Sequence, residues 1–132
     1  MIKIDSVTKK YGDFTAIENI NIEVADTSVF ALTGFNGSGK TTLLRAIIKE
    51  LPNEMAISTN EETAELNIMD KNVIQREVIN SRNSNADINL DLLTRHSLVS
   101  SNDAIIIGEL KGSEASVFFD SISTGHLGYA TV

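Results

Sequence analysis

The sequence contains no cysteine, so disulfide bonds and thiolate chemistry are both excluded. The first five residues, Met-Ile-Lys-Ile-Asp, lack the charged start, the apolar centre and the small-residue cleavage site of a secretory signal peptide. Both absences favour a protein that stays in the cytoplasm, where thiols are kept reduced and disulfides are rare.

Long hydrophobic runs are also absent. The longest apolar stretches, such as residues 104–107, are far shorter than the roughly 20 residues that a helix needs to cross a bilayer. A length of 132 residues supports one domain with a core of its own, and a hydrophobic content of 42% is ordinary for a soluble protein. We therefore expect a single soluble module without a membrane anchor of its own.

Positive charge is scarce. Eighteen acidic and eleven basic side chains give a net charge of −7, and no segment concentrates lysine or arginine. Tight binding of DNA or RNA through phosphate neutralisation is therefore not expected. A small anion can still bind where local donors outweigh the global charge, as they do in a glycine loop at a helix N-terminus.

Apolar patterning predicts an α/β fold. Strands are expected near residues 2–4, 20–24, 29–32, 55–58, 73–79, 103–110 and 129–132. Helices are expected from Thr41 to Pro52, after Asp87 as the N-cap, and from Ser113 onward. Strands that alternate with helices favour a mostly parallel sheet flanked by helices, here with antiparallel β strands at the N-terminus.

The spacing of apolar residues also predicts the buried faces of the last two helices. The residues expected to face inward are Ile88, Leu92, Leu93, His96 and Val99 on the first of them, and Ala115, Phe118, Phe119 and Ile122 on the second. On this pattern His96 is a packing residue.

Residues 34–41 match the pattern G-x-x-x-x-G-K-[ST] of a phosphate-binding loop. The residues expected to contact nucleotide are Gly34, Asn36, Gly37, Ser38, Gly39, Lys40, Thr41 and the following Thr42. Glycines let backbone N–H groups curl around phosphates, the lysine reaches the β- and γ-phosphates, and Thr41 ligates Mg²⁺. Because a strand is expected before the loop and a helix after it, we expect ATP with Mg²⁺ rather than a chance glycine turn.

Carboxylates follow two of the predicted strands. Glu109 ends the apolar strand, where ligands sit in open α/β sheets, and could hold Mg²⁺ through water or polarise the attacking water. Glu61, Glu62 and Glu65 follow the strand near residues 55–58, so one of them could act as a general base for water. The alternatives, a polar residue that ends a strand and a solvated acidic loop, remain open.

Two further residues have a functional and a structural interpretation. Tyr11 precedes Gly12 in a turn, where its ring could stack on adenine or simply belong to a hairpin. His126 lies in a segment of small residues, 123–128, at the tip of an expected turn. Neither pattern decides between the two interpretations.

The N-terminal segment of the chain resembles a known family. Residues 1–50, with segments 7–12 and 16–20 and the phosphate loop (Walker A), are similar to the start of an ABC-type ATPase domain. In that family the aromatic residue at the place of Tyr11 stacks on adenine. An ABC domain also carries a Ser-Gly-Gly signature and an Asp-Glu Walker B motif, and the sequence contains neither.

Residues 55–132 resemble the traffic ATPases of type II and type IV secretion, type IV pili and conjugation. Segments 61–66, 107–115 and 123–131 are similar to that family's acidic box, its Walker B variant ending in Gly-Glu, and its histidine box, in the family's order. The whole chain, 1–132, is thus expected to be one P-loop NTPase domain, ABC-like over residues 1–50 and secretion-like over residues 51–132. Because that family normally has a large N-terminal domain and continues past the histidine box, we expect a hybrid or minimal core.

The second resemblance implies Mg²⁺-dependent ATP hydrolysis. Thr41 and Glu109 would hold the metal, Glu62 or a neighbouring carboxylate would orient water, and His126 would position the γ-phosphate. Such ATPases work as rings in which a neighbour supplies an arginine, for which Arg76 and Arg82 are the candidates. A homo-oligomer at the inner face of the membrane, with a membrane-embedded transport or secretion partner, follows from the resemblance. The competing expectations are an ABC-like subunit that needs a partner's signature motif and a module that binds ATP without turnover.

Overall fold

The computed structural model describes residues 1–25, 32–80 and 87–132, and the α/β prediction is confirmed within them. The elements are β1 (Ile2–Tyr11), β2 (Phe14–Val24), α1 (Lys40–Glu50), β3 (Ile57–Glu61), β4 (Val73–Glu77), α2 (Leu90–Val99), β5 (Ala104–Ile107), α3 (Glu114–Ser123) and β6 (Leu127–Ala130). The strand expected at residues 29–32 lies outside the described residues except for Leu32. None of the described helices is long and apolar enough to cross a membrane.

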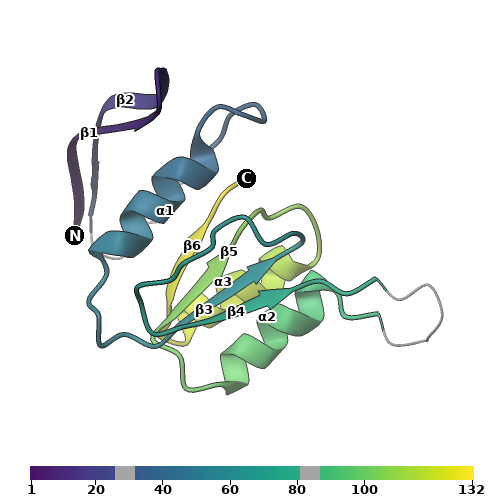
Figure 1. The fold of residues 1–132 in the computed structure, drawn as a ribbon. Helices are drawn as coiled ribbons and strands as arrows, with labels where there is room; N and C mark the ends of the chain where they lie inside the picture. Colours follow the sequence, from purple (N-terminus) through teal and green to yellow (C-terminus); the bar gives the residue numbers. More distant parts are fainter. Residues whose placement is uncertain (26–31, 81–86) are drawn as a thin grey trace.

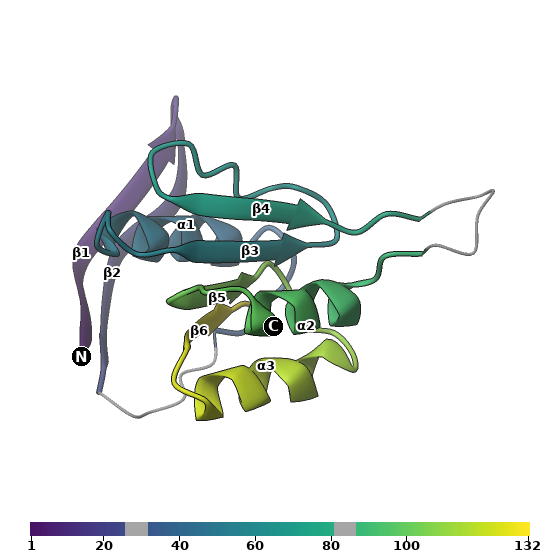
Figure 2. The same cartoon turned by 90° about the horizontal axis from the view of Figure 1, so that it is seen from below.

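The core of the fold is a parallel sheet with strand order β4-β3-β5-β6. Helix α1 covers one face of this sheet, and α2 and α3 cover the other (Figures 1 and 2). Successive side chains of a strand point to opposite faces. Ala104 and Ile106 therefore pack with α1, whereas Ile105 and Ile107 pack with α2 and α3.

The N-terminal hairpin of β1 and β2 stands apart from this sheet, on the side of α1 (Figure 1). Its strands are antiparallel, as expected, and Tyr11 pairs with Phe14 at the tip. A Cβ atom added to Gly39 would lie 2.6 Å from Cγ2 of Ile17. The middle of β2 is therefore packed directly against the residue that precedes α1.

The buried face of α2 differs from the expected one. The helix begins at Leu90 with Asn89 as N-cap, whose side chain accepts a hydrogen bond from the Leu92 N–H, and Asp87 is not the cap. His96 is exposed and Val99 is 85% exposed, so the prediction that both pack inward is wrong.

The physical reason is that the sheet presents polar side chains to this helix. The Ser97 hydroxyl lies 2.8 Å from that of Ser58 and accepts a hydrogen bond of 3.0 Å from the Asn60 amide. Buried polar groups must be paired, and the pairing selects the helix face. Of the expected apolar set, Leu93 is buried while Leu92 is 40% exposed.

On α3, Phe118 is buried as expected, but Phe119 is 47% exposed. The two neighbouring rings still contact each other edge to face, with centroids 5.9 Å apart. Val117 and Ser121 are buried in this helix instead. The buried residues of α3, Glu114, Val117, Phe118 and Ser121, are spaced at i, i+3, i+4 and i+7, and Phe119 lies about 100° beyond Phe118, outside this face.

Candidate functional site

A cleft of about 610 Å³ lies where strands β3 and β5 and the residue after β6 reach one edge of the sheet. Parallel strands end at the same edge, so residues distant in the sequence meet there. The lining residues are Tyr11, Phe14, Ala16, Asn36, Gly37, Ser38, Gly39, Lys40, Thr41, Thr42, Glu61, Glu62, Thr63, Glu65, Gly108, Glu109, Lys111 and Thr131. All the expected nucleotide contacts except Gly34 belong to this set.

The phosphate loop leads into the N-terminus of α1, whose first residue is Lys40. Gly37 and Gly39 have φ angles of +81° and +92°, a conformation that side chains disfavour, so glycine is required there. The first turn of α1 contains no acidic residue and no side-chain cap. Its first N–H groups therefore have no intrahelical partner and are available to an anion.

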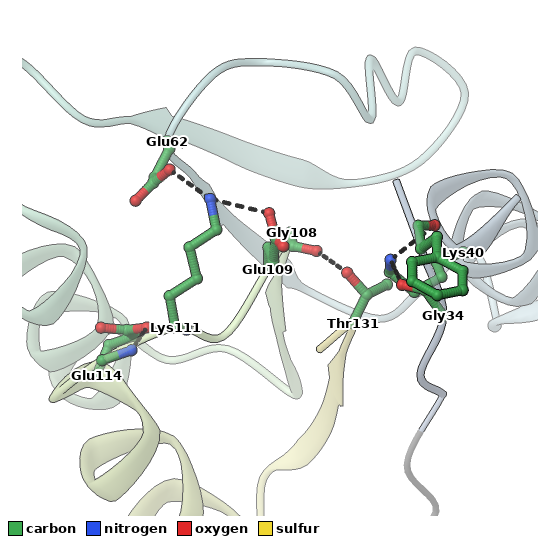
Figure 3. Close-up of polar contacts among 10 residues, drawn as sticks. Gly34, Lys40, Glu62, Gly108, Glu109, Lys111, Glu114 and Thr131 are labelled. Carbon is green, nitrogen blue, oxygen red and sulfur yellow. Dashed lines mark hydrogen bonds and ion pairs between the residues drawn. The ribbon is translucent and has the colours of Figure 1, made fainter. Parts of the chain in front are cut away.

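Lys40 is folded back over this loop (Figure 3). Its Nζ donates to the backbone oxygen of Gly34 at 2.5 Å and to that of Phe35 at 3.3 Å. Gly34 thus contributes its carbonyl to the lysine rather than lining the cleft. A cation and a helix N-terminus at one place suit a phosphate group.

Two aromatic rings from the hairpin tip also line the cleft. Tyr11 and Phe14 are both exposed, at 50% and 66%, and both line the cleft. The Lys9 ammonium lies 5.4 Å from the centre of the Tyr11 ring. Phe14 was not expected here, although a two-residue turn after Tyr11 would have placed it opposite that ring.

The acidic side of the cleft is organised by one lysine. Lys111 Nζ lies 3.0 Å from Oε2 of Glu62 and 3.0 Å from Oε2 of Glu109 (Figure 3). The structure thus brings together two expected carboxylates from different strand ends. The sequence did not predict Lys111 as a residue of the site. Its position two residues after Glu109 was the one feature of the sequence that could have indicated it.

Glu61 has a different environment from Glu62. It is 3% exposed, and its Oε1 accepts the N–H groups of Glu65 and Leu66, each at 3.0 Å. Burial raises the pKa of Glu61, although these two hydrogen bonds act in the opposite direction. Glu61 therefore anchors the acidic loop, while Glu62 is the exposed member of the pair.

Thr131 follows β6 at the same edge of the sheet. It is 2% exposed, and its hydroxyl donates to the Gly108 carbonyl at 2.5 Å, while its own carbonyl accepts the Leu110 N–H at 2.8 Å. These two bonds hold the backbone on both sides of Glu109. Thr131 was not expected in the site, because its place depends on the direction of β6.

His126 is not among the residues that line the cleft, so its expected role in positioning the γ-phosphate stays a prediction. It precedes β6, which pairs in parallel with β5 from Leu127 opposite Ala104, so it lies at the opposite edge from Glu109. Its Nδ1 is within 3.2 Å of the Ser121 carbonyl oxygen. That contact ties the imidazole to the end of α3.

Arg76 is also turned away from the role expected for it. Its guanidinium contacts the hydroxyls of Ser58 and Ser97 and is half-buried beside the sheet. In this structure Arg76 is thus engaged within its own subunit, between β3 and α2. Arg82, the other candidate, lies outside the described residues.

The donor set suits Mg²⁺ carried by a nucleotide. Within residues 1–25, 32–80 and 87–132 there is no group of three or more His, Asp or Glu side chains that could hold a metal ion by themselves. Thr41 and Glu109 line one cleft and offer a hydroxyl and a carboxylate. Mg²⁺ is typically bound by one or two such protein oxygens together with water and substrate phosphates.

Comparison with known proteins shows the family and the fold. The sequence profile of the family described as "Type II/IV secretion system protein" matches residues 17–132. Among solved structures, the VirB11 ATPase from the Brucella suis type IV secretion system, in complex with sulphate, is 27% identical with a TM-score of 0.59, over 74% of this chain and 28% of that one. The Legionella pneumophila ATPase DotB is 28% identical with a TM-score of 0.56, over 75% of this chain and 28% of that one.

Curated relatives match parts of the chain of different length. The sulfate/thiosulfate import ATP-binding protein CysA of Synechocystis is 42% identical over 74 residues, which are 54% of this chain and 21% of that protein. An uncharacterised protein of Methanocaldococcus jannaschii is 32% identical over 102 residues, 76% of this chain and 38% of that protein. The chain thus spans well under half the length of these relatives.

Proposed function

Because the chain belongs to the type II/IV secretion system protein family, we propose that it binds ATP with Mg²⁺ in the cleft and hydrolyses it. The observation that carries this proposal is the position of Lys40. Its ammonium lies over the phosphate loop at the start of α1, in the same cleft as Glu62 and Glu109. A phosphate-binding end and an acidic, water-accessible end in one cleft are what hydrolysis of a terminal phosphate requires.

Each region of the cleft then has a role. Lys40 and the first N–H groups of α1 hold the β- and γ-phosphates, and Thr41 and Glu109 hold Mg²⁺. The ion, when bound, neutralises charge on the phosphate oxygens. Glu62, exposed at the cleft, orients the attacking water and accepts its proton.

The hairpin tip provides the base end. Tyr11 and Phe14 offer exposed aromatic surface in the same cleft as the phosphate loop. A base stacks on such a ring without a requirement for a specific hydrogen bond. We assign the stacking contact to Tyr11 and the edge of the base pocket to Phe14.

Partners follow from the family. We propose a homo-oligomer in the cytoplasm that serves a membrane-embedded secretion or transport partner. The support is that both solved structures are ATPases and that one belongs to a type IV secretion system.

A second candidate is an ABC-type ATP-binding subunit. It is favoured by the 42% identity to an import ATP-binding protein over 74 residues. In this case ATP turnover would need a partner that supplies the signature motif missing from the sequence. Turnover by the purified chain alone would separate the two candidates.

The test is an ATP titration by calorimetry, together with a phosphate-release assay. The wild type should bind Mg·ATP, and Lys40→Ala should lose about 10- to 100-fold in affinity, because a charge-assisted contact to the phosphates is removed. Lys49→Ala is the matched control, since Lys49 is an exposed lysine in the last turn of the same helix. Unchanged affinity in a folded Lys40→Ala protein would refute the assignment.

A further inference from the structure

Lys111 occupies a bridging position that the proposed chemistry does not use. Its ammonium contacts Glu62 and Glu109, each at 3.0 Å, and the two carboxylates come from the ends of β3 and β5. The three side chains are 51%, 56% and 39% exposed, so each would be free to move without this contact. One cation thus holds together two groups that would otherwise repel each other.

The backbone of Lys111 is itself fixed. Oε1 of Glu114 accepts the N–H groups of Lys111 and Gly112, both at 2.7 Å. Glu114 is 6% exposed and lies in the first turn of α3, so a buried carboxylate ties the start of the lysine side chain to a helix. Figure 3 shows this succession from Glu114 through Lys111 to the two cleft carboxylates.

We propose that Lys111 is a positioning residue, which is anchored by Glu114 and keeps the Glu62 and Glu109 carboxylates side by side in the cleft. This inference rests on the proposed ATP hydrolysis. An incoming triphosphate carries several negative charges and would push two unpaired carboxylates away from it. Lys111 counters this repulsion and so limits the movement of the groups that orient water and metal.

The same geometry separates this role from direct phosphate binding. Two of the three N–H donors of Lys111 are directed to carboxylates, and the phosphate loop already has its own ammonium in Lys40. Lys111 should therefore affect the rate of hydrolysis much more than the affinity for nucleotide. Misplacement of a reacting group by about 1 Å can cost about 100-fold in rate.

The experiment compares Lys111→Met and Lys111→Arg with the wild type. Lys111→Met should lower kcat by about 10- to 100-fold, while KM and the calorimetric affinity for ATP without Mg²⁺ change by less than about twofold. Lys111→Arg, which keeps the charge, should recover most of kcat. The matched control is Arg95→Met, which removes an exposed cation 2.8 Å from Asp91 on α2, outside the cleft, and should leave kcat unchanged.

Two further experiments test the contact of Lys111 with Glu62 and its anchoring by Glu114. In a Glu62→Gln background, Lys111→Met should cost less than in the wild type, because only the part of its effect that is exerted through Glu109 remains. Glu114→Ala should lower kcat in the same direction, whereas Glu114→Gln retains an oxygen acceptor and should stay near the wild type. Thermal unfolding of every variant separates these effects from loss of the fold.

A readout without turnover tests the contact directly. Acetylation of lysine amines, followed by mass spectrometry, should modify Lys111 more slowly than the exposed Lys49, and the difference should shrink in the Glu62→Gln/Glu109→Gln double variant. Equal labelling of both lysines in the wild type would overturn the inference.

The kinetic measurements also test the proposed role of Lys111. An unchanged or increased kcat in Lys111→Met, or a loss of ATP affinity as large as the loss of rate, overturns the inference alone. A wild-type chain that shows no turnover at any concentration overturns the proposed hydrolysis and this inference with it.

Discussion

At the residue scale, the cleft combines side chains of opposite charge. Lys40 lies over the phosphate loop, whereas Glu62 and Glu109 share a single lysine. The chain as a whole carries a charge of −7, so anion binding depends on this local arrangement rather than on the global charge.

Tyr11→Ala should weaken ATP binding more than it weakens binding of inorganic triphosphate. The reason is that the exposed ring contacts the base and not the phosphates, and base–aromatic stacking contributes about 1–3 kcal/mol. Calorimetric titration with each ligand measures the difference. Equal losses for both ligands would return Tyr11 to a purely structural role in the hairpin.

Glu109→Gln should leave nucleotide binding largely intact and reduce hydrolysis strongly, because the amide keeps the shape but loses the charge. A positioned general base contributes typically ~10²–10⁴-fold, so a loss of that size in Glu62→Gln would identify the base. Glu65→Gln serves as the comparison within the same loop and should lose less. Similar small losses in all three variants would contradict the assigned roles.

At the scale of secondary-structure elements, the phosphate loop is shaped by its contact with β2. A Cβ atom on Gly39 would lie 2.6 Å from Ile17 Cγ2 and 3.1 Å from the Ala16 carbonyl oxygen. A Cβ atom on Gly37 would meet nothing within 4 Å, although both glycines have positive φ. A comparison of alanine substitutions at Gly37 and Gly39 therefore separates the cost of backbone strain from the cost of steric contact.

Gly37→Ala should cost about 1–2 kcal/mol of stability from the left-handed backbone alone. Gly39→Ala should cost more, and it should also lower ATP affinity, because the loop must move away from the hairpin. Urea unfolding and ATP titration of both variants check this order. Equal effects of the two substitutions would show that the hairpin does not constrain the loop.

The start of α3 depends on the charge of Glu114. Burial tends to raise the pKa of this carboxyl, but N–H groups of Lys111, Gly112 and Glu114 outweigh it, and the pKa is lowered from its ordinary value of 4.5. A carboxyl with a lowered folded-state pKa stabilises the fold above its unfolded pKa, and the contribution is lost as the pH falls through the folded-state pKa.

The stability difference between wild type and Glu114→Gln should therefore shrink as the pH falls from neutral through the lowered folded-state pKa, as measured by urea unfolding. Glu61→Gln is a control in which the pH dependence of the stability difference should have the opposite sign. Burial raises the pKa of Glu61, so the ionised wild type is penalised as the pH rises, and the variant should gain relative stability toward neutral pH. A difference that is independent of pH in both variants would contradict these assignments.

At the scale of the whole molecule, the parallel order β4-β3-β5-β6 brings the ends of distant segments to one edge. The chain end also returns to the region of the phosphate loop, where the Val132 N–H donates to the Leu32 carbonyl at 3.4 Å. The cleft is therefore a product of topology, with contributions from segments throughout the chain.

If the chain works as an oligomer, its specific ATPase activity should rise with protein concentration. The physical reason is that no arginine is among the described residues that line the cleft, so an arginine that stabilises the transition state would have to come from another subunit. Phosphate release measured across a range of concentrations, alongside the size of the particle in solution, checks this. Constant specific activity from a monomer would contradict the oligomeric proposal.

The sequence by itself determined the features that depend on neighbouring residues. The phosphate loop is recognisable because its glycines, Lys40 and Thr41 act through local backbone geometry within eight residues. The central strands and the three helices were predictable for the same reason, since periodicity is a local property. Glu62 and Glu109 were candidates because they follow predicted strands and because their segments resemble the acidic box and the Walker B variant of the secretion family.

Only the tertiary structure decided the features that depend on strand order and direction. The parallel pairing of β6 with β5 carries Thr131 to the cleft and leaves His126 at the opposite edge. Lys111 joined the site because Glu62 and Glu109 meet there, and the inward face of α2 followed from its pairing with polar residues of β3. Such contacts join residues far apart in the sequence, and no local pattern encodes which partners the folded chain brings together.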